Sequence, residues 1–181
     1  MQITISVSRL AKMYLGLHLA VPIICLTAYF SLWGWHGFMT YHGLCIAIVL
    51  FILSVPIHEI IHYTCFVAFN GASRRNVHFH FEKTNLVPYV TCNERISAGR
   101  YKMAALAPFM VIGLPLSLYG LLRENSTAEL TGILAILGCS GDLIMYSLLS
   151  RVRNSAIVWR FSTEAGQKIV KVGFNIESNF P

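Results

Sequence analysis

Residues 13–58 have the sequence MYLGLHLAVPIICLTAYFSLWGWHGFMTYHGLCIAIVLFILSVPIH, which contains no Asp, Glu, Lys or Arg over 46 positions. One crossing of a bilayer takes about 20 apolar residues, so this stretch is long enough for two crossings and too long for one. Its middle, WGWHGFMTYHG, gathers the Trp, Tyr, His and Gly that are typical of a turn at a membrane surface. The stretch therefore predicts two spans, at about residues 14–33 and 43–69.

The whole chain has the composition of a membrane protein. Of its 181 residues, 55% are hydrophobic and 12% are charged, and the mean hydropathy is +0.60. A soluble domain carries about 25% charged residues, so the composition excludes a cytosolic enzyme, a disordered tail and a coiled coil. Two more apolar stretches predict spans at about residues 101–122 and 130–150. We therefore expect a single all-α integral membrane domain over residues 1–181, with four transmembrane helices in the lipid bilayer and a tail from residue 151.

The basic residues are divided unequally between the two sides that four spans would create. The N-terminal arm, the segment 70–102 and the tail share one side and hold 13 Lys and Arg, whereas the opposite side has only Arg123. Positively charged loops are retained in the cytoplasm, so both termini are predicted to be cytoplasmic. This topology accounts for the formal net charge of +6, and no nucleic-acid motif accompanies it, so no nucleic-acid partner is predicted.

The only sizeable polar insertion lies between the second and third spans. Residues 77–81, VHFHF, alternate apolar and polar side chains at the period of a β-strand, and residues 86–92 form a second short extended candidate. We predict a small cytoplasmic β-hairpin here. His78 and His80 share one face of its first strand and are candidate substrate-binding residues, and an extended substrate could add to this strand. The more common explanation of such residues is a polar edge of a surface hairpin.

The second predicted span contains His58-Glu59-Ile60-Ile61-His62, which matches the motif HExxH. Histidines four residues apart lie one turn apart on the same helix face, so His58 and His62 are candidate ligands of one Zn²⁺ ion. Glu59 is the candidate catalytic base toward water on the metal. Ionisable groups are costly inside a bilayer, and they usually face the protein interior and serve a function there. The alternative is a pair of core histidines held by hydrogen bonds with Glu59 as their partner.

Asp142 is the candidate third metal ligand. It is the only aspartate in the chain and the only charged residue between Leu130 and Ser150. His62 lies seven residues and Asp142 eight residues from the cytoplasmic ends of their spans, which corresponds to depths of about 10 and 12 Å. Matching depths allow Asp142 to converge with His58 and His62. The alternative roles for this aspartate are a helix cap after Gly141 and a partner for a tail arginine. Cys139, three residues earlier, could contact the same site.

These motifs resemble the putative zincin peptidases, a bacterial membrane family related in plan to site-2 proteases. The resemblance covers roughly residues 56–151 and rests on HEIIH, VPYVTCNE, RYKMAALAPFMVIGLPL and GCSGDLIMY. It implies that His58, His62 and Asp142 bind zinc, that Glu59 is the catalytic base, and that the protein resides in the bacterial inner membrane. One departure is the tail stretch RFSTEAGQ, which lacks the acidic and histidine-containing patch often found in the family.

Taken together, these features predict a zinc metallopeptidase that cleaves membrane-embedded or membrane-adjacent proteins or peptides. One alternative is a non-enzymatic metal carrier or channel that uses the same His, Glu and Asp side chains. Another is a pseudoprotease that binds membrane helices without cutting them. A carrier would be expected to have more polar residues along several spans, and the first and third spans offer few. This favours the peptidase.

Overall fold

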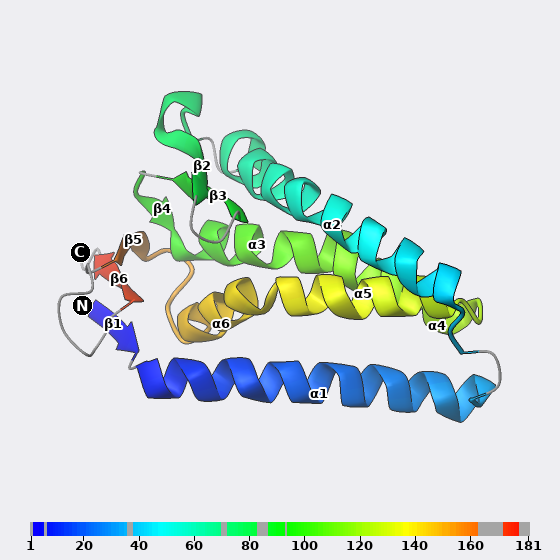
Figure 1. The fold of residues 1–181 in the computed structure, drawn as a ribbon. Coiled ribbons are helices and arrows are strands. Elements are labelled where there is room, and N and C mark those ends of the chain that lie inside the picture. Colours follow the sequence, from blue (N-terminus) through cyan, green and yellow to red (C-terminus); the bar gives the residue numbers. More distant parts are fainter. Residues whose placement is uncertain are drawn as a thin grey trace.

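The computed structural model places the first two predicted spans in two long helices (Figure 1). Helix α1 covers Val7–Trp33 and is followed by Gly34, whose φ of +74° lies in the left-handed region that favours glycine. Helix α2 covers Tyr41–Thr64 and begins after Thr40, whose side-chain oxygen accepts a hydrogen bond from the backbone N–H of Gly43. The predicted break between the two spans is confirmed.

The structure describes residues 2–5, 7–35, 38–69, 72–82, 87–92, 94–162 and 172–177. The tail stretch RFSTEAGQ, residues 160–167, lies mostly outside the described residues. Short helical turns follow α2 within the described part: the π-helix η1 covers Cys65–Phe69 and the 3₁₀-helix η2 covers Arg74–Asn76.

The third and fourth predicted spans differ in their continuity. Helix α3 (Ala98–Pro108), the π-helix η3 (Phe109–Gly113) and helix α4 (Leu114–Leu122) together form one apolar segment. The fourth is broken at Cys139 into α5 (Ser126–Gly138) and α6 (Ser140–Leu149), which are bent by 50°. Among the described residues, three helical segments are long and apolar enough to cross a membrane, or four if the bent pair is one span. The chain is thus a mostly helical membrane protein.

Helices α4 and α5 pack with their backbones close together. A Cβ atom at Gly120 would collide with the backbone of Glu129, and one at Gly132 would collide with the backbone of Ser117. Small residues allow membrane helices to approach this closely without steric conflict. Helix α5 also packs against α1 and α2, so it forms the centre of the bundle.

The predicted hairpin is confirmed. Strand β2 covers Val77–Glu82 and strand β3 covers Val87–Cys92, and they pair antiparallel with Phe79 opposite Val90. The Phe79 ring stacks on Tyr63 of α2 with 5.0 Å between ring centroids, which fixes one face of the hairpin on that helix. The opposite face carries His78 and His80 because successive residues of a strand alternate between its faces.

The expectation of helices with only a hairpin is wrong in one respect, because the structure has a second, four-stranded sheet. Its strand order is β1-β6-β5-β4, and each neighbouring pair is antiparallel. The sheet joins the start of the chain to its tail, and both sheets lie at the same end of the helices (Figure 1). Its strands are β1 (Gln2–Ile5), β4 (Ile96–Ser97), β5 (Ile157–Ser162) and β6 (Val172–Glu177).

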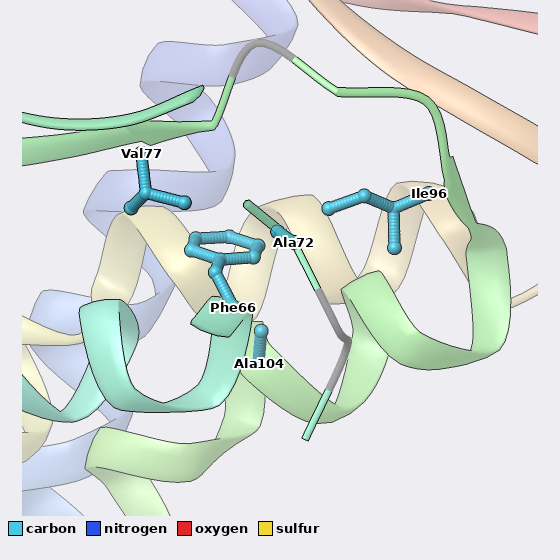
Figure 2. Packing of buried hydrophobic residues seen from close by; sticks show 5 residues of the cluster. All are labelled: Phe66, Ala72, Val77, Ile96 and Ala104. Atoms are coloured by element: carbon cyan, nitrogen blue, oxygen red, sulfur yellow. The ribbon is translucent and has the colours of Figure 1, made fainter. Parts of the chain in front are cut away.

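A small apolar core joins the hairpin to η1, the π-helix that continues α2, and to α3. Figure 2 shows the Phe66 ring at the centre of this cluster, between Val77 of the hairpin and Ala104 of α3. All its members are less than 9% exposed, so the hairpin rests on a closed apolar contact. The core fixes the hairpin beside the last turn of α2, where the HExxH motif lies. The cluster consists of Phe66, Ala72, Val77, Ile96 and Ala104.

Candidate metal centre

The two motif histidines meet on one face of α2, as their spacing predicts. The Nε2 atoms of His58 and His62 lie 3.0 Å apart, and their ring centroids are separated by 4.7 Å. The side chains are only 15% and 11% exposed. A helix of 3.6 residues per turn superimposes positions i and i+4, so this proximity follows from the local sequence alone.

Asp142 completes a triangle of donor atoms with the two histidines. Its Oδ2 lies 3.1 Å from His58 Nε2 and 3.3 Å from His62 Nε2. The aspartate occupies the first turn of α6, but the residue at the N-cap of that helix is Cys139. The alternative role of Asp142 as the helix cap therefore does not describe this structure.

The triangle fits a zinc ion in both geometry and charge. A regular tetrahedron with metal–ligand bonds of about 2.0–2.1 Å places its ligand atoms about 3.3 Å apart. The three observed separations are 3.0, 3.1 and 3.3 Å. Two imidazole nitrogens and one carboxylate oxygen are a common zinc donor set that leaves a fourth position open. A divalent cation would also offset the carboxylates of Asp142 and Glu59, which lie at one cavity.

The His58 ring has a partner on the side away from the triangle. Its Nδ1 atom lies 3.6 Å from Cys139 Sγ, and the backbone of Ala104 in α3 lies next to the His62 ring. Metal-binding histidines usually have such a partner on the second ring nitrogen, because it fixes the orientation and tautomer of the ring. The Cys139 contact agrees with the expectation that this residue reaches the site.

Glu59 lies beside the triangle without forming part of it. Its Oε1 is 3.9 Å from His58 Nε2, whereas its Oε2 accepts a 2.8 Å hydrogen bond from the backbone N–H of Val90 in β3. One carboxylate oxygen is therefore held by the hairpin and the other faces the histidines. This is the arrangement that a general base requires, because the basic atom must be positioned and yet free to accept a proton.

A cavity of about 560 Å³ opens onto this centre. Its walls carry the two histidines, Glu59 and Asp142, together with Tyr14 of α1, Tyr101 of α3 and residues 88–90 of β3. Sequence reasoning did not find Tyr14, Tyr101 or Val90. A tyrosine or valine in an apolar segment has no distinguishing local pattern, so no signal in this single sequence could have found them.

The structure does not bring the other two candidate histidines into this cavity. His78 and His80 are exposed on β2 and are absent from the described residues that line it. The His80 ring stacks on Tyr89, and its Nε2 lies 2.9 Å from Thr91 Oγ1 on the paired strand. The strand next to the metal centre is β3 rather than β2. A role of His78 and His80 in substrate binding stays a prediction.

Glu94, a carboxylate in the polar insertion, has a structural role in the connection before β2. Its Oε1 accepts hydrogen bonds from Asn76 Nδ2 at 2.7 Å and from the backbone N–H of Ser73 at 2.9 Å. These donors hold the pKa of Glu94 below its usual value, since both stabilise the ionised carboxylate. The side chain is thus engaged in fixing the turn, and the residues grouped at the metal centre are His58, His62 and Asp142.

Comparison with known families agrees with this geometry. A family model described as putative zincin peptidase matches residues 51–157, which is more than half of the chain. The chain belongs to the putative zincin peptidase family. The matched region contains the HExxH motif, the hairpin and Asp142, so it spans every residue of the donor triangle. Membership of a zincin family implies zinc as the metal and suggests a metallopeptidase. Searches of curated proteins and of solved structures found no match.

Proposed function

We propose that this protein is a zinc-dependent peptidase that hydrolyses peptide bonds of membrane-embedded or membrane-adjacent proteins. The observation that carries the proposal is the donor triangle of His58, His62 and Asp142 with the Glu59 carboxylate beside it. The triangle is formed by helices that are apolar enough to cross a membrane. Ionisable groups placed at such a depth are costly and typically mark a functional site.

The protein side chains have separate tasks in this reaction. His58, His62 and Asp142 would hold a zinc ion, which supplies Lewis-acid chemistry by acidifying water and polarising a carbonyl group. Glu59 Oε1 accepts the proton of the attacking water and later delivers it to the leaving amine. The hydrogen bond from Val90 to Glu59 Oε2 keeps the carboxylate in place during both transfers.

The substrate is proposed to lie extended along β3, because proteases act on unwound backbone. The backbone N–H of Val90 points away from β2 and toward Glu59, so this edge of β3 faces the cavity. The Tyr89 and Val90 positions both line that cavity. This placement replaces the expectation that substrate adds to residues 77–81, since the described residues that line the cavity come from β3 and not from β2. The Val90 N–H is taken by Glu59 and Pro88 has no N–H, so at this edge the carbonyl oxygens of β3 would accept hydrogen bonds from the substrate backbone, independently of the substrate sequence.

We further propose that both termini and the segment 70–102 are cytoplasmic, on the basis of the 13 to 1 division of basic residues. Two single-cysteine variants test this, made in a chain whose own cysteines are replaced by alanine. Arg74→Cys lies before the hairpin and Glu124→Cys lies between α4 and α5, and both positions are exposed. A membrane-impermeant maleimide should label the Glu124 variant in intact cells and the Arg74 variant only after lysis. The opposite pattern would reverse the orientation.

Metal analysis of purified protein tests the metal centre. The wild type should contain about one zinc ion per chain, and His58→Ala and Asp142→Ala should contain little, because each removes one of three ligands. His42→Ala is the matched control, since His42 is an exposed histidine at the start of the same helix. Full zinc content in the Asp142 variant would remove Asp142 from the ligand set.

Cleavage of a labelled membrane-protein fraction then tests the reaction class. The zinc-loaded wild type should produce fragments, and the His58→Ala protein should not. Zinc binding without cleavage across a broad substrate panel would instead favour the pseudoprotease. Zinc uptake into proteoliposomes by the purified chain would favour the carrier, and either result would overturn the peptidase proposal.

A further inference from the structure

A second cavity, of about 340 Å³, adjoins the metal centre. It lies toward the N-terminal half of α2, and its walls come from α2, η3 and α5. The lining is largely apolar, and Ser54 already donates its hydroxyl hydrogen to the carbonyl oxygen of Phe51. The apolar side chains that define this cavity are Phe51, Val55, Ile112 and Ala135.

The two cavities meet at the reactive residues. His58, Glu59 and Gly138 line both of them. Gly138 has no side chain, and a Cβ atom placed on it would meet only Phe51 Cε2, at 3.7 Å. The space between the cavities is therefore open at this glycine. Gly138 therefore places no side chain of its own between a molecule bound at the metal centre and the second cavity.

We propose that the second cavity is a specificity pocket for an apolar side chain of the substrate, next to the bond that is cleaved. The inference rests on the proposed peptidase function and adds a preference for large apolar residues such as Leu or Phe. The first cavity contains the polar groups and the strand edge that suit a peptide backbone, whereas the second offers apolar walls. A peptide backbone at Glu59 would therefore place one side chain in the second cavity.

The walls also determine which side chains the pocket rejects. Apart from His58 and Glu59 at the shared boundary, its lining residues carry no charge. A charged substrate side chain that extends past Glu59 to the apolar walls would lose its hydration there without gaining an ionic partner, which is costly. A larger apolar side chain would gain affinity with each group that it buries, and one methylene in such a pocket changes binding by about 10-fold or more.

Amino-acid hydroxamates provide a test that does not depend on cleavage. The hydroxamate group chelates zinc, so N-acetyl-glycine, leucine and phenylalanine hydroxamates should differ only in the side chain presented to the pocket. Calorimetric titration of the zinc-loaded full-length protein in detergent measures their affinities. The leucine and phenylalanine compounds should bind at least about 10-fold more tightly than the glycine compound.

Filling the pocket should abolish this preference. Ala135→Leu adds three carbons to the wall of the second cavity alone, so it should reduce the preference to less than about 2-fold and leave glycine hydroxamate binding intact. Ala20→Leu is the matched control, because Ala20 is exposed on α1 and lines neither cavity. Phe51→Ala is a second variant that does not overpack the core, and it should shift the preference toward still larger side chains.

The outcomes separate this inference from the proposed function. Binding that is independent of side-chain size, or a preference that survives in Ala135→Leu, would refute the pocket alone. If the preference for large apolar side chains disappears when phospholipid is added, the cavity binds an acyl chain, and this result would also refute the specificity pocket. Failure of every hydroxamate to bind the zinc-loaded wild type would refute the metal centre as a substrate site. The proposed specificity pocket would then be refuted as well, because it depends on that site.

Discussion

Replacing Glu59 by glutamine is expected to separate catalysis from metal binding and folding. In the wild type, Glu59 Oε2 accepts a 2.8 Å hydrogen bond from the Val90 N–H, and Oε1 lies 3.9 Å from His58 Nε2. The glutamine oxygen can keep the bond to Val90. Its amide nitrogen then takes the place of Oε1, where it can donate a hydrogen bond but cannot accept a proton from water. The three donor atoms of the metal triangle are unchanged.

The structure sets the size of each effect. Loss of the general base should slow cleavage by about 10²- to 10⁴-fold. The hydrogen bond to Val90 is retained in a neutral form, so the free energy of unfolding should fall by no more than about 1 kcal/mol. Glu59→Ala also loses the base, but it leaves the Val90 N–H without its partner at a cost of about 1–3 kcal/mol. Local opening of β3 should then increase by about 5- to 150-fold.

Three measurements on the wild type and the two variants check this reasoning. Zinc content should be equal in all three proteins, and cleavage should be at least about 100-fold slower in both variants. Hydrogen exchange at the Val90 amide should accelerate in Glu59→Ala and remain near the wild-type rate in Glu59→Gln. Wild-type cleavage by Glu59→Gln would exclude Glu59 as the base. Unchanged Val90 exchange in Glu59→Ala would show that the hairpin is not held by this contact.

Other predictions concern the scaffold around the site. Ser117→Ala should lower the free energy of unfolding by about 1–3 kcal/mol in detergent, because it removes the 3.0 Å hydrogen bond to the buried Glu129 carboxyl group; an unchanged midpoint in thermal unfolding would contradict this. Gly132→Leu should prevent correct packing of α4 on α5 and give aggregated protein in size-exclusion chromatography, whereas Gly16→Leu, with no atom near the added Cβ, should elute like the wild type. The pKa of Glu94 is lower in the folded state than its usual value of 4.5, so its contribution to stability is present above that value and is lost as pH falls through the lowered pKa. The difference in unfolding midpoint between the wild type and Glu94→Gln should therefore shrink between pH 6 and pH 3, and a constant difference would refute the role of the carboxylate.

The helices and the histidine pair could be predicted from the sequence because both depend on local patterns. The charge-free stretch 13–58 is longer than one bilayer crossing, and no soluble packing would accommodate it. The spacing of His58 and His62 brings their imidazoles together on any α-helix. The hairpin was also predictable, since alternation over a few residues and a short connection are features of adjacent segments.

The tertiary structure alone decided how distant segments meet. Strand β1 pairs with β6 across almost the full length of the chain, and a local pattern carries no information about such a partner. The 50° break at Cys139 and the packing of α5 against α1, α2 and α4 determine where Asp142 points, which residue counting along the spans does not predict. The tertiary structure also places β3 at the metal centre, since the Val90 N–H bonds to Glu59, whereas Phe79 of β2 stacks on Tyr63 of α2. The apolar cavity beside Glu59 likewise exists only where α2, η3 and α5 converge around Gly138, since a cavity is a property of packed surfaces and not of any one segment.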